Sequence, residues 1–119
     1  MGLFDSLKNI VNSDAVKKAV SEGAFFDLMY VNGHLHRQYA FLRHAGKDLL
    51  LVVVNFEDHD VDVDVCLPAH AFDYLQLKET TATATDLLSK EKESMILRKD
   101  GRVRMMIGAR SGRVWKLKA

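Results

Sequence analysis

Residues 48–67 contain two strand patterns of different kinds, separated by a short polar segment. Leu49 to Val54 is an unbroken apolar run that ends in β-branched residues and is too short for an ordinary helix, which is typical of a strand buried on both faces. Residues 60–67 alternate aspartate with valine, so they predict a strand with one solvated and one buried face. The segment 55–59 between them predicts a hairpin loop. A doubly buried strand followed by an amphipathic one indicates an antiparallel sandwich.

Turn signals divide the rest of the chain after residue 23 into further short strands. Candidates of suitable length and composition span residues 25–31, 38–44, 85–88, 94–98, 102–107 and 113–118. Pro68 ends the aspartate-rich strand because proline cannot donate to a ladder, and Asp100-Gly101 predicts a hairpin turn. Residues 69–75 have weak helical character, and 78–83 predict a loop. About eight short strands of this kind predict a mainly β fold, a Greek-key antiparallel β-sandwich.

The first 22 residues predict a short helical segment, which divides the chain into residues 1–22 and a sandwich over 23–119. One face of this segment gathers its large apolar residues at helical spacing, namely Leu3, Phe4, Leu7, Ile10 and Val11. Isolated helices this short are marginal in water, so the apolar face needs a partner. The segment either folds back on its own sandwich or meets the same face of a second copy. We expect the second arrangement, a homodimer through these helices.

Composition limits the class of protein. The chain has 119 residues, 48% of them hydrophobic and 28% charged, which predicts one soluble domain with its own core. A formal net charge of +1 gives nucleic acid no bulk electrostatic attraction. No apolar run approaches the ~20 residues of a membrane span, and the start shows no signal-peptide pattern, so no membrane partner is expected and the cellular location is left open. The single Cys66 excludes an internal disulfide and is expected to be a small buried hydrophobe.

A group of aspartates is the first candidate for a metal site. Asp58, Asp60, Asp62 and Asp64 could gather a calcium ion, but residues two apart on a strand lie roughly 6.5–7 Å apart along a flat face. A solvated strand face is the better interpretation, with Arg102 and Arg104 as a basic neighbour of matching period.

The histidines and serines give no stronger site. His34 and His36 lie in a turn without a third ligand at a recognised spacing, while His44, His59 and His70 are scattered. The serines Ser89, Ser94 and Ser111 lack a nucleophile elbow and an obvious base. We therefore expect no catalytic residue, no metal and no cofactor in this chain. Core packing is expected for Phe25, Phe26, Phe41, Phe56 and Trp115, and partial exposure for Tyr30, Tyr39 and Tyr74.

One stretch resembles a known family. Leu-Leu-Leu-Val-Val-Val-Asn-Phe at 49–56, the alternating acidic strand and Leu-Pro-Ala-His-Ala-Phe at 67–72 together resemble the C-terminal β-sandwich domain of α-amylase-family glycoside hydrolases. Residues 7–13 and 23–28 resemble the end of the last helix of the catalytic barrel and its passage into that sandwich. The strands at 39–43 and 85–88 fit the same pattern, so the resemblance spans nearly the whole chain.

The resemblance implies a non-catalytic accessory domain that caps or stabilises a catalytic barrel acting on α-glucans. The family's catalytic carboxylates lie on the barrel and match nothing here, so none is carried over. The implied interface to the barrel is the face formed by Leu3, Phe4, Leu7, Ile10 and Val11. Contact with α-glucan is expected to be weak or absent, because the aromatic residues are needed for the core. Two alternatives are a free-standing carbohydrate-binding module, which an exposed, coplanar pair of aromatics would favour, and an immunoglobulin-like interaction domain.

Overall fold

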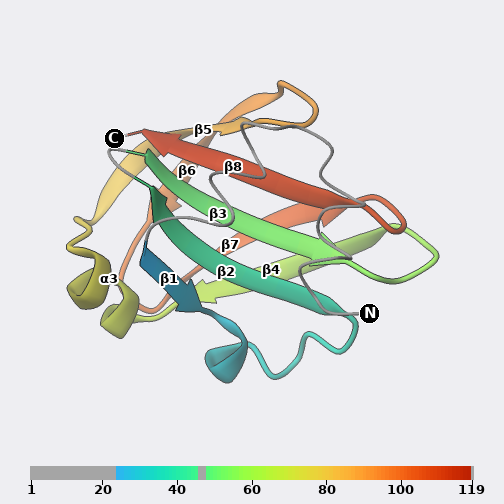
Figure 1. The fold of residues 1–119 in the computed structure, drawn as a ribbon, viewed down its shortest axis with the longest axis horizontal. Helices are drawn as coiled ribbons and strands as arrows, with labels where there is room; N and C mark the ends of the chain where they lie inside the picture. Colours follow the sequence, from blue (N-terminus) through green and yellow to red (C-terminus); the bar gives the residue numbers. More distant parts are fainter. Residues whose placement is uncertain (1–23, 46–47, 119) are drawn as a thin grey trace.

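The computed structural model describes residues 24–45 and 48–118, which form two antiparallel sheets (Figure 1). The elements are β1 (Ala24–Asp27), η1 (Met29–Val31), β2 (Gln38–Ala45), β3 (Asp48–Asn55), β4 (Val61–Leu67), α3 (Ala69–Leu75), β5 (Thr80–Asp86), β6 (Lys92–Leu97), β7 (Gly101–Ile107) and β8 (Gly112–Lys118). The larger sheet has the order β1-β2-β3-β8-β5-β6, and β4 pairs with β7 in the smaller one. The prediction of a mainly β sandwich with about eight strands is confirmed.

The hydrophobic core lies between the two sheets. In β4 the valines Val63 and Val65 face the core, whereas Asp62 and Asp64 are exposed, as the alternating pattern predicts. From the larger sheet, Trp115 is 1% exposed, and its Nε1 donates a hydrogen bond to Met105 Sδ of β7 at 3.4 Å. This contact links the two sheets at the centre of the core.

Two expected hairpins are connections between the sheets. The segment 55–59 follows β3, which pairs with β2 and β8, and leads into β4, which pairs only with β7 among the described strands. Asp100-Gly101 likewise joins β6 of the larger sheet to β7 of the smaller one. The prediction of a tight turn at Asp100-Gly101 is nevertheless confirmed, because Asp100 has a φ of 61°, which is typical of such turns. The pairing was wrong because turn residues reverse the chain without deciding which sheet it enters.

Asn55 shows how the first of these connections is fixed. Its buried Nδ2 donates to the carbonyls of His59 and Gly108, both at 3.0 Å, and its Oδ1 accepts from the backbone N–H of Glu57 at 2.9 Å. These bonds tie the end of β3 to the loop beyond β7, so they direct the chain from one sheet to the other.

Two element predictions need correction. The strand expected over 25–31 ends at Asp27, whose Oδ1 accepts from the N–H of Met29 at 2.9 Å and starts η1. The loop expected over 78–83 contains the start of β5, which lies between β8 and β6 and is not an edge strand. Its buried residues are alanines alternating with threonines, a weak hydrophobic signal despite the strand preference of threonine.

The helix predicted over 69–75 is confirmed as α3. None of the helices among residues 24–45 and 48–118 is long and apolar enough to cross a membrane. The helical segment predicted over 1–22 lies outside the described residues.

Candidate docking surface

The outer face of the larger sheet is apolar and buried where β2, β3 and β8 lie side by side. Along β3, side chains alternate between the core and this second face, which confirms that the strand is buried on both sides. Its members are Phe41, Leu50, Val52, Val54 and Val114, all 0–1% exposed. We name these five residues the outer apolar face. The register places Val52 opposite both Phe41 and Val114, so the residues form a continuous patch across three strands.

Partly buried hydrophobic side chains form a rim around the outer apolar face. They are Tyr39, Phe56, Leu87 and Leu88. On the β1 side, the ring centroid of Phe25 lies 5.0 Å from that of Phe41, and Phe25 is 36% exposed. The guanidinium carbon of Arg43 lies 5.1 Å from the Phe25 centroid, a cation–π arrangement, and burial lowers the pKa of Arg43. Phe25 is therefore not the core residue that its strand pattern predicted.

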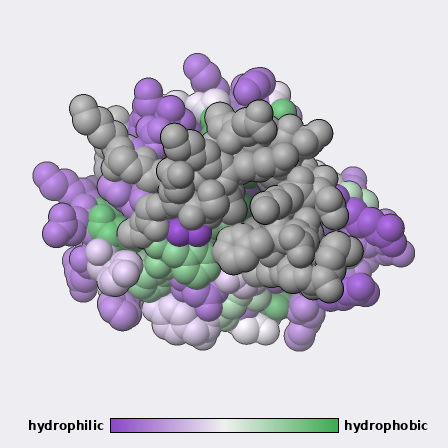
Figure 2. All heavy atoms as spheres, in the orientation of Figure 1, coloured by the Kyte–Doolittle hydropathy of each residue, from purple (hydrophilic) through white to green (hydrophobic). Residues whose placement is uncertain are grey.

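The outer apolar face ends where β5 begins. In β5, Ala82 and Ala84 face the core, so the alternating Thr81, Thr83 and Thr85 lie on the outer side, and Thr81 and Thr83 are exposed. Figure 2 shows hydrophilic residues at both ends of the molecule and a hydrophobic area over β1 and the adjoining part of β2. The buried apolar residues of this face thus lie on β2, β3 and β8, and threonines take their place on β5.

A buried ion pair holds the rim beside β8. Asp86 is 1% exposed, and its Oδ2 accepts from Arg113 Nη1 and Ser89 Oγ, both at 3.0 Å. Its Oδ1 accepts from the N–H of Leu88 at 3.1 Å. Burial favours the neutral form of Arg113, but the hydrogen bond and charge of Asp86, with a smaller contribution from Glu91, outweigh it and raise the pKa of Arg113. The network therefore fixes the turn that carries the rim leucines.

The aspartates of β4 are engaged with protein groups. The guanidinium of Arg104 donates to both carboxylate oxygens of Asp62, with Nη2–Oδ2 at 2.8 Å, and this hydrogen bond lowers the pKa of Asp62. Asp60 Oδ1 accepts from the N–H of Ala109 at 2.9 Å. The expected basic neighbour is confirmed for Arg104, which stands opposite Asp64 in the ladder and pairs diagonally with Asp62.

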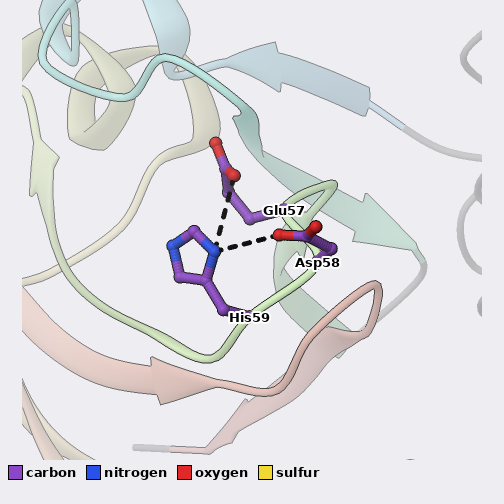
Figure 3. Close-up of side chains that lie close together, drawn as sticks. All are labelled: Glu57, Asp58 and His59. Atoms are coloured by element: carbon purple, nitrogen blue, oxygen red, sulfur yellow. Dashed lines mark hydrogen bonds and ion pairs between the residues drawn. The ribbon is translucent and has the colours of Figure 1, made fainter.

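Glu57, Asp58 and His59, in the loop between β3 and β4, bring two carboxylates to one ring nitrogen (Figure 3). His59 Nδ1 lies 3.2 Å from Asp58 Oδ1 and 3.7 Å from Glu57 Oε2, and Arg37 Nε lies 3.7 Å from Glu57 Oε1. The hydrogen bond with His59 lowers the pKa of Asp58. All three potential ligand atoms lie within 4.8 Å of one another, a grouping that sequence reasoning missed because it treated His59 singly. The contacts with Arg37 and His59 describe a solvated charge network.

The remaining predicted site residues are dispersed. His34 Nε2 contacts the carbonyl of Asp64 at 2.7 Å, and His36 is exposed, so the two turn histidines have different surroundings. Cys66 is only partly buried, which corrects the expectation of a buried thiol. The interface residues Leu3, Phe4, Leu7, Ile10 and Val11 lie outside the described residues.

A pocket of about 400 Å³ opens beside the segment that joins α3 to β5. Its lining includes His44, Gln76, Lys78 and Glu79, and Glu79 is the one carboxylate among its described lining residues. Glu79 Oε2 accepts from the N–H of Lys99 at 3.3 Å. Glycoside hydrolysis needs two carboxyl groups across the bond that breaks, so this lining does not provide that arrangement.

The described residues form an antiparallel sandwich whose larger sheet has a second apolar face. A family model for the α-amylase C-terminal all-β domain matches residues 30–118. The chain therefore belongs to this family, which is a non-catalytic domain. The resemblance found in the sequence is confirmed. No match was found among curated proteins.

Several solved structures share the fold. The α-amylase from Geobacillus thermoleovorans, in complex with acarbose, is 14% identical with a TM-score of 0.57, over 85% of this chain and 19% of that one. AmyP in complex with maltose is 17% identical with a TM-score of 0.54, over 82% and 17% of the two chains. The α-galactosidase I from Mortierella vinacea is 11% identical with a TM-score of 0.55, over 70% and 21%. The chain thus spans about a fifth of the length of these enzymes.

Proposed function

We propose that this chain is the accessory C-terminal domain of an enzyme that acts on α-glucans, and that it stabilises the catalytic barrel by packing against it through the rim of the outer apolar face. The carrying observation is the rim of partly buried hydrophobic side chains, which are Tyr39, Phe56, Leu87 and Leu88, with the exposed Phe25 beside them. The five residues inside the rim are 0–1% exposed, so a partner meets the rim and not these residues. Partly exposed apolar side chains gathered on one face are a surface that a partner protein can bury.

The solved structures support the choice of partner. The α-amylase from Geobacillus thermoleovorans has the same fold over 19% of its chain, so in that protein the sandwich is part of a much longer enzyme. The same is true of an α-galactosidase, of which the match covers 21%. A catalytic body beside such a sandwich is the partner that both examples share. The chain itself has no hydrolytic role in this proposal.

The experiment uses an α-amylase-family barrel from the same genome, expressed without its own C-terminal domain. The half-life of its starch-hydrolysing activity during heating is measured with and without this chain. We expect the chain to lengthen the half-life several-fold and to hydrolyse no starch alone.

Two matched variants locate the contact. Leu88→Glu adds a charge to the rim of the outer apolar face and is expected to abolish the protection. Met106→Glu makes the same kind of change at an exposed residue of β7 in the smaller sheet, and is expected to protect as well as the unaltered chain. A folded, unaltered chain that leaves the half-life unchanged contradicts the proposal.

A further inference from the structure

Two exposed tyrosines flank one nearly buried phenylalanine at the end of the sandwich beside β1. Tyr30 of η1 is 59% exposed and Tyr74 of α3 is 58% exposed, whereas Phe26 of β1 is 8% exposed. The ring centroid of Phe26 lies 6.1 Å from that of Tyr30 and 5.7 Å from that of Tyr74. We name Phe26, Tyr30, His70 and Tyr74 the aromatic cluster.

Phe26 and His70 hold the aromatic cluster in place. Phe26 is part of the core, and the His70 ring meets it edge-on, with centroids 5.5 Å apart. Tyr74 follows His70 by one helical turn, so α3 presents both rings on one face. Aromatic contacts of this geometry are favourable, and rings that are already positioned lose little conformational entropy when a ligand binds. The tyrosines are thus exposed rings on a fixed base.

Polar groups accompany the exposed rings. His70 and Asp73 are exposed on α3, and the spacing of 70, 73 and 74 places them on the face that carries Tyr74. The Asp73 carboxylate is only loosely paired, with Oδ1 3.7 Å from Lys99 Nζ. A carboxylate, an imidazole and two phenol groups can exchange hydrogen bonds with vicinal hydroxyls. The cluster therefore combines flat apolar rings with donors and acceptors around them.

This combination fits a neutral sugar chain. A pyranose has an apolar face of C–H groups and a rim of hydroxyls, which matches an amphipathic aromatic surface. The cluster is also separate from the outer apolar face, since η1 and α3 flank β1 at one end of the fold (Figure 1) and Phe26 faces the core rather than the outside of the sheet. A domain packed on a barrel through the outer apolar face leaves the aromatic cluster free.

We propose that Tyr30 and Tyr74 form a surface site for α-glucan chains, with His70 and Asp73 contacting the sugar hydroxyls. The choice of α-glucan rests on the function proposed above. The two tyrosines are more than half exposed, so we expect weak affinity for a short oligosaccharide and tighter binding of long chains that engage many copies. The sequence analysis predicted at most a weak contact with α-glucan, because most aromatic residues were expected in the core. In the structure, Tyr30 and Tyr74 lie outside the core.

The test is native electrophoresis of the full chain through gels with and without soluble starch. We expect starch to retard the unaltered chain, and Tyr30→Ala and Tyr74→Ala each to reduce the retardation several-fold. Tyr74→Phe, which keeps the ring, is expected to retain most of it. Met106→Ala, at another exposed residue of 56% exposure, is the control and is expected to behave as the unaltered chain. Circular dichroism shows whether each variant is folded.

The outcomes separate this proposal from the docking proposal. Protection of the barrel is expected to persist in a Tyr30→Ala, Tyr74→Ala double variant. Barrel protection and retardation by starch therefore report on docking and on sugar binding separately. An unaltered chain that starch does not retard overturns the surface site, and so does retardation that both tyrosine variants retain. A double variant that loses barrel protection instead assigns the cluster to a protein interface and overturns the sugar site.

Discussion

Arg113 of β8 donates a 3.0 Å hydrogen bond from Nη1 to the carboxylate of Asp86, which is 1% exposed at the end of β5. The same carboxylate also accepts from Ser89 Oγ and from the N–H of Leu88. The pair therefore joins two neighbouring strands and fixes the turn that carries two rim residues of the outer apolar face.

Removing the Asp86 carboxylate is expected to lower the free energy of unfolding substantially. Asp86→Ala leaves the Arg113 charge, whose side chain is 22% exposed, without its buried partner, and breaking such a pair costs about 3 kcal/mol in free energy of unfolding. Urea denaturation measures the loss. Glu91→Gln is the control, because Glu91 contacts the same guanidinium from a 64% exposed position and is expected to cost under about 1 kcal/mol. Equal losses in the two variants contradict a special role for Asp86.

The Asp62–Arg104 pair predicts a pH-dependent contribution to stability. Because the hydrogen bond from Arg104 lowers the pKa of Asp62, the contribution is fully present above the ordinary aspartate pKa of about 3.9 and is lost as the pH falls through the lowered folded value. Melting temperatures of the unaltered chain and Asp62→Asn should differ near neutral pH and converge once the pH has fallen below the lowered pKa of Asp62. Asp64→Asn should show a smaller difference, since the guanidinium binds Asp62. A difference in melting temperature that grows as the pH falls would contradict this prediction.

The acidic face of β4 is expected not to bind calcium. The Asp62 carboxylate already accepts hydrogen bonds from Nε and Nη2 of the Arg104 guanidinium, and Asp60 accepts one from the backbone N–H of Ala109. Millimolar calcium should leave the melting temperature unchanged. A large rise that disappears in Asp62→Asn contradicts the expectation.

The first 22 residues give a prediction about assembly. Their apolar face of Leu3, Phe4, Leu7, Ile10 and Val11 gains roughly 1.5–3 kcal/mol for each side chain that is buried. In the absence of a barrel, we expect the full chain to form a two-fold dimer and a chain starting at Gly23 to lose it, as measured by light scattering. A full chain that is monomeric at high micromolar concentration contradicts the prediction, as does a dimer that persists in the shortened chain.

The strands were largely predictable because their patterns are local. The run from Leu49 to Val54 predicted a doubly buried strand, and the alternation after Asp60 predicted the solvated face of β4. The hairpin at 55–59 was wrong because strand pairing depends on tertiary contacts such as those of the buried Asn55 side chain. The start of β5 was missed because Ala82 and Ala84 bury little apolar area, and the alternation of small residues is hard to see.

The docking surface was only half predictable. The sequence indicated that β3 is buried on both faces, but it did not show which residues of other strands share the second face. Its other members, Phe41 and Val114, come from strands far apart in sequence and meet only through the register of β2, β3 and β8. The exposure of Tyr30 and Tyr74 was foreseen, but their shared contact with Phe26 depends on how α3 packs beside β1.

The most direct test of the central claim uses Leu88, a partly buried rim residue of the outer apolar face, and Met106, an exposed residue of β7 in the smaller sheet. A glutamate at either position adds a charge, which is unfavourable to bury without a partner. Sedimentation with the α-amylase-family barrel measures the dissociation constant of each variant. We predict that Leu88→Glu weakens the complex about tenfold or more, whereas Met106→Glu leaves the dissociation constant unchanged. Equal dissociation constants for the two folded variants, or no complex with the unaltered chain, would contradict the claim that the rim of the outer apolar face packs against the barrel.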